Sequence, residues 1–191
     1  MLAMKTRQSY LKTLGFYAGK IDGIEGKLTK AAYKKLQKAY FTRESDIDGV
    51  YGKNTDILLV NAYRAFKYAK NFELEEFKCE CGGRYCTGYP VKLSAQLLKN
   101  LQKVRTKYGA TTITSGLRCR PYNDSLVGSS STSKHMDGKA LDIYNAKTKT
   151  EAGRKEVMAY VKKLIGHNYT YCNIGGNYPN MGAAVHFDVK K

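Results

Sequence analysis

Two segments of the chain each carry a histidine and an aspartate that could bind a metal ion. His135 follows a loop rich in glycine and serine (residues 127–133), and an alternating stretch after it predicts a strand that contains Asp142. Near the end of the chain, His186 and Asp188 alternate with apolar residues in a second predicted strand. Alternate side chains of a strand share a face. Imidazole and carboxylate groups are zinc ligands, so the segments indicate a metal site.

A catalytic zinc ion needs about three protein ligands and one open position. An isolated histidine is more often a core or surface residue than a ligand, so either segment alone is consistent with an ordinary turn and strand. Small residues lie on the same predicted strand faces, Ala140 beside Asp142 and Ala184 beside His186. Two strands of this kind favour a metal centre with room for a substrate.

Around these residues the sequence resembles the zinc D-alanyl-D-alanine carboxypeptidase family, which includes phage endolysins that cleave L-alanyl-D-glutamate bonds. Over about residues 75–191, the resemblance is carried by Ser115-Gly116-Leu117-Arg118, Ser133-x-His135-x-x-Gly138-x-Ala140-x-Asp142 and His186-x-Asp188. It implies zinc as the cofactor, with His135, Asp142 and His186 as ligands. It also implies that Arg118 holds an oxygen of the substrate or transition state, and that Ser133 supports the site from behind the ligands.

One position departs from this family. Many members have Glu or Asp three residues before the last histidine, where this chain has Ala183. A general base is still needed to activate water and protonate the leaving amine. Asp188 is our candidate because it shares a strand face with His186, and its alternative role is to orient that histidine. Asp137 and His167 are reserve candidates.

The first part of the chain contains an internal repeat. The segment IDGIEGKLT at residues 21–29 returns as IDGVYGKNT at residues 47–55. Each copy predicts an Asp-Gly turn, a second glycine (Gly26 or Gly52) that can take positive φ and a threonine that caps the next helix. Two such units, each too small to bury its own apolar face, predict one compact domain. Its three helices are expected at residues 9–14, 30–40 and 56–68.

This repeat resembles the peptidoglycan-binding domain found beside many cell-wall hydrolases. Over about residues 4–68, the matching residues are Leu14-Gly15-Phe16-Tyr17, Asp22-Gly23, Gly26, Thr29 and Leu36-Gln37. The resemblance implies bacterial peptidoglycan as the partner. The Asp-Gly loops shape the domain whether or not they touch glycan, so no binding residues are assigned.

The chain is expected to contain two domains, residues 1–70 and 71–191, with a linker near 69–75 where basic residues give way to acidic ones. The second part alternates helices with short strands, which indicates the α+β class. We therefore expect a three-helix domain followed by a peptidase domain with an antiparallel sheet flanked by helices. Its clearest elements are helices at 93–108 and 152–165 and a strand at 111–114.

The net charge of +17 is spread along the chain, with about +8 in residues 1–70 and +9 in the remainder. A diffuse positive field suits a polyanionic surface such as a bacterial wall. No basic arm is present, and nucleic acid is not expected as a partner. The sequence shows neither a membrane span nor a signal peptide. We therefore expect a monomer that is synthesised in the cytoplasm and acts on the wall after release.

Three of the five cysteines, Cys79, Cys81 and Cys86, are close in sequence, whereas Cys119 and Cys172 lie far downstream. An odd number excludes complete disulfide pairing. The three could form a structural zinc site with Cys119, or a disulfide, or could stay as half-buried thiols. Their spacing is not the Cys-x-x-Cys of zinc ribbons, and the sequence leaves all three interpretations open.

Together these features predict a zinc-dependent peptidoglycan hydrolase of the phage or prophage endolysin type, which cleaves the stem peptide. The alternatives are a catalytically inactive wall-binding protein, favoured by Ala183, and a basic nucleic-acid binder. Carboxypeptidase and endopeptidase members share the metal motif, so the bond that is cut is left open. The loops at residues 123–132 and 173–181 are expected to set specificity.

Overall fold

The first 70 residues fold into three helices, as the sequence predicts. The computed structural model describes residues 1–190, and these helices are α1 (Met4–Thr13), α2 (Lys27–Tyr40) and α3 (Lys53–Tyr68). A 3-10 turn, η1 (Glu44–Asp46), lies between α2 and α3. Helix α1 begins at Met4 rather than at residue 9, because no proline or glycine interrupts residues 4–8 and Gln8 already faces the core.

Each copy of the repeated loop surrounds one buried glutamine. Nε2 of Gln37 in α2 donates to Asp48 Oδ1 (2.9 Å), the Val50 carbonyl (3.1 Å) and Thr55 Oγ1 (3.0 Å), and its Oε1 accepts from the Gly49 N–H (2.7 Å). In α1, Gln8 makes the four equivalent contacts with the first loop, at 2.7–3.4 Å. The repeat therefore has pseudo-symmetric interactions as well as a repeated sequence.

The threonine of each loop does not cap the helix that follows. Helices α2 and α3 begin two residues before it, directly after Gly26 and Gly52, and neither N-cap is bonded by a side chain. These two glycines have φ angles of −84° and −91°, so the positive φ expected there lies instead at Gly23 and Gly49, in the Asp-Gly turns. Thr29 and Thr55 lie inside the first turn, where their hydroxyls donate back to loop carbonyls. The prediction of threonine caps is wrong, because these hydroxyls bond to the loop and to the buried glutamine instead.

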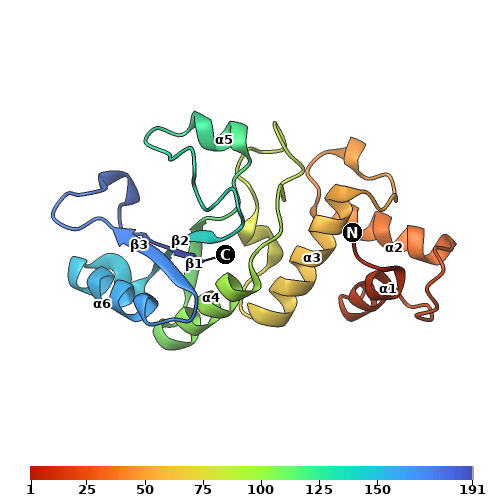
Figure 1. Ribbon diagram of the computed structural model, residues 1–191, viewed down its shortest axis with the longest axis horizontal. Helices are drawn as coiled ribbons and strands as arrows, with labels where there is room; N and C mark the ends of the chain where they lie inside the picture. Colours follow the sequence, from red (N-terminus) through yellow and green to blue (C-terminus); the bar gives the residue numbers. More distant parts are fainter. Residues whose placement is uncertain (191) are drawn as a thin grey trace.

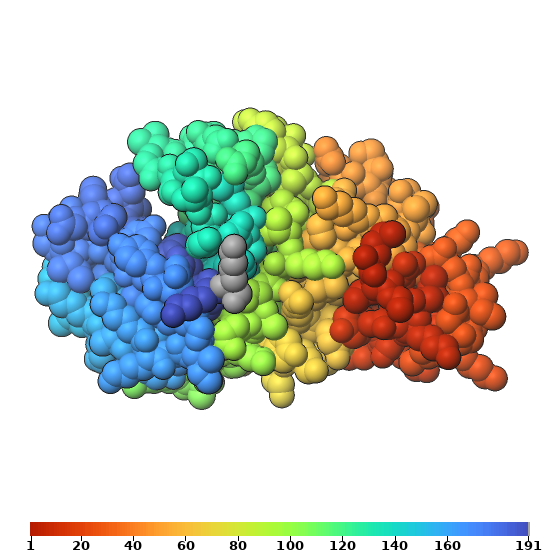
Figure 2. Space-filling model, viewed as in Figure 1, coloured from red at the N-terminus to blue at the C-terminus, as the bar shows by residue number. Residues whose placement is uncertain are grey.

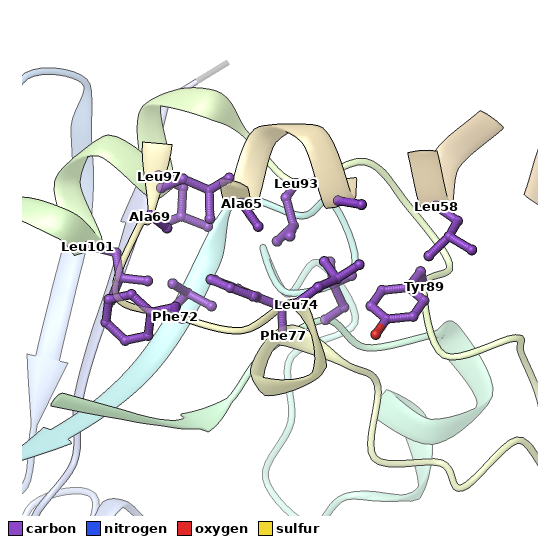
Figure 3. Close-up of a cluster of buried hydrophobic side chains, with 14 of the residues drawn as sticks. Leu58, Ala65, Ala69, Phe72, Leu74, Phe77, Tyr89, Leu93, Leu97 and Leu101 are labelled. Carbon is purple, nitrogen blue, oxygen red and sulfur yellow. The ribbon is translucent and has the colours of Figure 1, made fainter. Parts of the chain in front are cut away.

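Helix α3 belongs to the core of both halves of the chain. Its Leu58 and Ala65 lie in the same buried cluster as Leu97 and Leu101 of α4 (Ala95–Tyr108), as Figure 3 shows. The segment expected to be a linker joins this cluster through Ala69, Phe72 and Leu74, and ends in the 3-10 turn η2 (Leu74–Phe77). This connection is therefore packed and is not a solvent-exposed spacer.

Polar contacts reinforce this junction. Asn61 of α3 donates through Nδ2 to the Val91 carbonyl (2.9 Å) and accepts from the Leu93 N–H (2.7 Å). Asp56, also in α3, pairs with Lys92 Nζ at 2.6 Å. The segment that leads into α4 is thus fixed to α3 by hydrogen bonds and by an ion pair.

The second half of the chain contains a four-stranded antiparallel sheet. Its strands are β1 (Thr111–Ser115), β2 (Ala140–Asn145), β3 (His167–Cys172) and β4 (Val185–Val189), in the order β1-β2-β4-β3. This arrangement confirms the expected α+β class. Strand β3 was not predicted, and it forms the edge beside β4.

Helices α4 and α6 (Glu151–Lys162) cover one face of the sheet, and the short α5 (Arg120–Ser125) lies on the other side (Figure 1). Two more 3-10 turns, η3 (Ala146–Lys149) and η4 (Pro179–Met181), lie in the connections. The covered face is apolar and includes Leu141, Ile143 and Phe187, all fully buried. Strand alternation therefore turns the polar residues of β2 and β4 toward α5.

Helix α4 has clear sequence signals at both ends. Ser94 Oγ accepts the Leu97 N–H at 3.4 Å as its N-cap, and Gly109 ends it with a φ of 80°.

Among residues 1–190, no helix is long and apolar enough to cross a membrane.

Candidate metal centre

Four polar or aromatic residues form one row across the sheet. In the strand register, Ser115 of β1 pairs with Asp142 of β2, Asp142 with His186 of β4, and His186 with Tyr171 of β3. Paired residues of neighbouring strands project to the same face. The sheet thus places Asp142 and His186 side by side, although they are 44 residues apart in sequence.

His135 reaches this row from the loop before β2. Gly138 makes the tight turn with a φ of 67°, and a Cβ there would collide with the Lys92 carbonyl. The His135 carbonyl accepts the Arg118 N–H at 3.3 Å, which fixes the loop to the segment after β1. The expected approach of a loop histidine to a strand carboxylate is therefore present in the structure.

The hydrogen bonds of both histidines leave one nitrogen of each ring facing Asp142. His135 Nδ1 lies 2.7 Å from the Gly116 carbonyl, which can only accept, so this nitrogen carries the proton. His186 Nε2 lies 3.4 Å from Asp188 Oδ2, a carboxylate oxygen. The other nitrogens, His135 Nε2 and His186 Nδ1, lie 3.4 and 2.7 Å from Asp142 Oδ1. Two imidazole nitrogens and one carboxylate oxygen thus converge, and a proton or a metal cation between them would satisfy all three.

The three convergent groups are deeply buried, and two of them, Asp142 and His186, have pKa values shifted by their neighbours. Burial alone raises the pKa of Asp142, but hydrogen bonds from His135 and His186 outweigh it and hold the pKa well below its usual range. Burial alone lowers the pKa of His186, but Asp142 and Asp188 outweigh it and raise the pKa. The site therefore favours positive charge, which protons or a metal cation can supply.

The donor set fits a zinc ion. His135, Asp142 and His186 each offer one ligand atom, and these atoms lie within 4.8 Å of one another. Two imidazoles and one carboxylate are a common ligand set of catalytic zinc, and the fourth position then stays open. The hydrogen bonds at the far side of each histidine are the kind that orient metal-bound imidazole.

Arg118 lies at the edge of this cluster. Its Nη2 lies 3.1 Å from Asp142 Oδ2, and its Nε and Nη2 donate to Ser115 Oγ at 3.0 and 2.8 Å. Gly116 lets the segment before Arg118 pass close to Phe77, because a Cβ there would lie 2.6 Å from the Phe77 carbonyl oxygen. The guanidinium is therefore held beside the convergent groups in a fixed orientation.

Asp188 lies behind His186, on the side opposite Asp142. Its Oδ1 accepts from Asn168 Nδ2 (2.8 Å) and from the Tyr169 N–H (2.9 Å). Burial raises the pKa of Asp188, but hydrogen bonds from His186 and Asn168 outweigh it, so the pKa is lowered. The carboxylate is thus ionised and fully engaged by three donors.

A cleft of about 1210 Å³ opens over the row. One wall is formed by residues 126–134, which include Ser133, and the other by residues 178–184, which include Ala183. Figure 2 shows both segments, the first in teal and the second in blue, at the upper left of the molecule. All three convergent groups line its floor together with Arg118.

Tyrosines form a part of the cleft that the sequence did not predict. The Tyr171 ring stacks on His186, with centroids 4.5 Å apart, and Tyr178 packs on Tyr171 at 4.8 Å. Among the described residues, Tyr178 alone of the non-glycine residues has a positive φ, at 59°. The alternation of Tyr169 and Tyr171 is the only sequence signal for these rings, and it is too short to predict strand β3.

The two reserve candidates lie apart from the convergent groups. Asp137 is exposed and pairs with Lys134 at 3.2 Å. His167 lies at the start of β3, in register with Val189. Neither residue is part of the group that could hold a metal ion.

The fold and this site define a candidate metal centre on an antiparallel sheet, joined to a helical repeat domain. Residues 70–173 match the family model of peptidase M15, and residues 3–55 match that of a peptidoglycan-binding domain. The chain therefore belongs to the peptidase M15 family, and it is a peptidase that acts on peptidoglycan. The M15 match includes His135 and Asp142, whereas His186 lies beyond it. No curated protein matches the chain in a sequence search.

Proposed function

We propose that this protein is a zinc-dependent hydrolase of the peptidoglycan stem peptide. The proposal rests mainly on the orientations of the two histidine rings. The Gly116 carbonyl accepts from one nitrogen of His135 and the Asp188 carboxylate from one nitrogen of His186, so the other nitrogen of each ring faces Asp142. Three buried acceptors without a cation between them would be costly. A zinc ion held by His135, Asp142 and His186 satisfies all three.

A bound zinc ion would supply Lewis acidity to the scissile carbonyl and make an attacking water more acidic. The residues of the chain perform the remaining tasks. Arg118, held by Ser115, offers a guanidinium to the oxygen on which negative charge develops. Tyr171 covers the ring of His186 and excludes bulk water from that side of the site.

For Asp188 we propose the orienting role, one of the two roles that the sequence left open. The carboxylate lies behind His186 and accepts from three donors, so its contacts suit a partner that fixes the ring and its proton at Nε2. Ser133 lines the cleft beside His135, and we propose that it supports the substrate there.

The N-terminal domain would deliver the peptidase to its substrate. We propose an endolysin of phage or prophage origin that acts as a monomer after release from the cell that made it. The high positive charge of the chain favours adsorption to anionic wall polymers. The inactive wall-binding protein stays the alternative, since Ala183 replaces the carboxylate that many relatives have.

Digestion of purified peptidoglycan tests this proposal. We expect the protein to release stem-peptide fragments, to stop in the presence of a chelator and to recover with zinc. Mass spectrometry of the products identifies the bond, since free D-alanine marks a carboxypeptidase and a new D-glutamate amino terminus marks an endopeptidase.

The controls are the His186→Ala and Asp142→Ala variants. Each should lose at least a thousandfold in kcat/KM, which corresponds to about 4 kcal/mol of transition-state stabilisation. Both variants should still sediment with the wall. Cleavage that persists after complete metal removal would refute the metal centre. Wall binding without peptide release by the zinc-loaded protein would instead support the inactive alternative.

A further inference from the structure

Four of the five cysteines meet at a second site, away from the cleft floor. Cys79, Cys81 and Cys86 lie in the loop that follows η2, and Cys119 is the N-cap residue of α5. Their sulfur atoms all lie within 4.8 Å of one another. Cys79, Cys81 and Cys119 are at most 9% exposed, and Cys86 is partly buried.

The sulfur positions match a tetrahedral thiolate site. Cys79 Sγ lies 3.8 Å from Cys119 Sγ, and Cys81 Sγ lies 3.5 Å from Cys86 Sγ. A zinc–sulfur distance of about 2.3 Å gives tetrahedral sulfur–sulfur edges of about 3.8 Å. All four cysteines are free, and neither pair is at the bonding distance of a disulfide, which is about 2.05 Å.

Backbone N–H groups point at two of the sulfur atoms. Cys119 N donates to Cys79 Sγ at 3.3 Å, and Gly88 N donates to Cys86 Sγ at 3.4 Å. Hydrogen bonds of this kind stabilise a thiolate. The same loop is held in place by a bond from Cys79 N to the Gly88 carbonyl at 2.8 Å.

We propose that Cys79, Cys81, Cys86 and Cys119 bind a structural zinc ion, separate from the catalytic site. Thiolate ligands in a tetrahedral arrangement select zinc over harder cations. Basic residues flank the ligands in sequence, namely Lys78, Arg84, Arg118 and Arg120, and they offset the negative charge of a four-thiolate zinc site.

This zinc ion would hold the wall of the catalytic cleft. Cys119 directly follows Arg118, whose guanidinium lies beside Asp142. The other three ligands belong to the loop after η2, and that loop is bonded to the same segment by Leu117 N and the Phe77 carbonyl at 2.9 Å. The metal would therefore tie α5 and Arg118 to the junction between the two halves of the chain.

Metal analysis of variants tests this proposal. In the double variant His135→Ala, His186→Ala, which lacks both histidine ligands of the catalytic site, native mass spectrometry should still find one zinc ion per chain. Stepwise addition of a mercurial reagent should release that ion as the thiols react. Cobalt substituted into this variant should give the near-ultraviolet thiolate-to-cobalt charge-transfer bands.

Adding Cys119→Ser to the double variant should remove the bound ion and these bands. Cys86→Ser, at the least buried ligand, is a second variant with the same expected loss and a smaller risk of misfolding. The matched control is Cys172→Ser, a buried cysteine that packs against Met158 and should keep the ion.

Two outcomes would overturn the proposal. One is a folded, reduced double histidine variant that binds no zinc or cobalt. The other is chain isolated without reductant in which these cysteines resist alkylation and the mass is lower by two hydrogens per disulfide. A chain that keeps one zinc ion at the cysteines but cleaves nothing would leave this inference intact and count against the proposed function alone.

Discussion

At the scale of single residues, the proposed metal centre depends on the groups that bond the far side of each histidine as much as on the ligands themselves. The Gly116 carbonyl and the Asp188 carboxylate determine which nitrogen of His135 and His186 is left for a metal. Neither group needs to touch the substrate. Substitutions behind the ligands should therefore alter metal binding before they alter chemistry.

Replacement of Asp188 by Asn tests this view. The variant loses the negative charge behind His186, and we expect zinc affinity to fall about 10- to 100-fold, as is common for such partners. Activity should return when zinc is raised to saturation. The measurement is zinc affinity by competition with a chelator, beside kcat at saturating zinc.

The matched control is Asp137→Asn, which changes an exposed carboxylate that pairs only with Lys134 on the cleft rim. It should leave both quantities unchanged. If Asp188→Asn keeps its zinc affinity but loses kcat at saturating zinc, Asp188 is the general base and the orienting role is refuted.

Much of this centre could be predicted from sequence, because strand alternation and a short loop motif are local properties. His135, Asp142, His186 and Arg118 do come together. The stacked Tyr171 and the donors to Asp188 were not predicted, because they depend on β3, which the sequence indicates only through the alternation of Tyr169 and Tyr171. Only Thr170 and Cys172 of that strand are buried, so its sequence lacks the apolar alternation that marks a strand.

At the scale of elements, the two loop-helix units are each stabilised by a glutamine from the preceding helix. Gln37 belongs to the Leu36-Gln37 motif of the sequence. Its structural equivalent, Gln8, lies in no recognisable motif, because the sequence of α1 has little resemblance to that of α2. Each amide bonds to groups of a loop that lies 11 to 21 residues further along the chain. Such long-range polar contacts leave no periodic signal.

Replacement of Gln37 by Ala should therefore destabilise the protein by roughly 1–3 kcal/mol, because the Asp48 carboxylate, a buried N–H and a buried hydroxyl lose their partner. Urea unfolding followed by circular dichroism measures the change. Gln102→Ala is the control, since Gln102 bonds only at the surface of α4, to Asn71 and Thr106. Equal stability of the two variants would show that the buried amide does not hold the loop.

At the scale of the whole molecule, the two family matches describe separate segments, but the hydrophobic core is continuous. Helix α3, the segment after it and α4 bury side chains against one another across the expected boundary (Figure 3). The change of charge near residue 70 indicated a linker, but it did not reveal the apolar residues between the charges. The predicted domains, residues 1–70 and 71–191, thus share a packed junction.

The ion pair of Asp56 and Lys92 at this junction gives a pH-dependent prediction. Burial raises the pKa of Asp56, but Lys92 and the donors Leu2 N and Tyr51 OH outweigh it, so the pKa in the folded state is lowered. A carboxylate of this kind stabilises the fold above its unfolded pKa of about 3.9, and this contribution is lost as the pH falls through the lower folded value.

Asp56→Asn should therefore cost roughly 1–3 kcal/mol at pH 7, and the difference from the unmodified protein should shrink below about pH 4. Urea unfolding at both pH values measures it. Glu156→Gln breaks an exposed pair with Lys147 and should cost at most about 0.5 kcal/mol. A difference for Asp56→Asn that stays constant down to pH 2 would contradict the ion-pair explanation.

The packed junction also limits how the protein can move on its substrate. Because no flexible linker separates the N-terminal helices from the cleft, the distance between the wall-binding domain and the active site is fixed by the packing of the fold. A wall-bound molecule can therefore cleave only bonds at one fixed distance from its binding site in the peptidoglycan. It must dissociate before it can cleave a bond elsewhere. Tighter adhesion would then slow digestion of the wall, so peptidoglycan cleavage should be fastest at intermediate ionic strength.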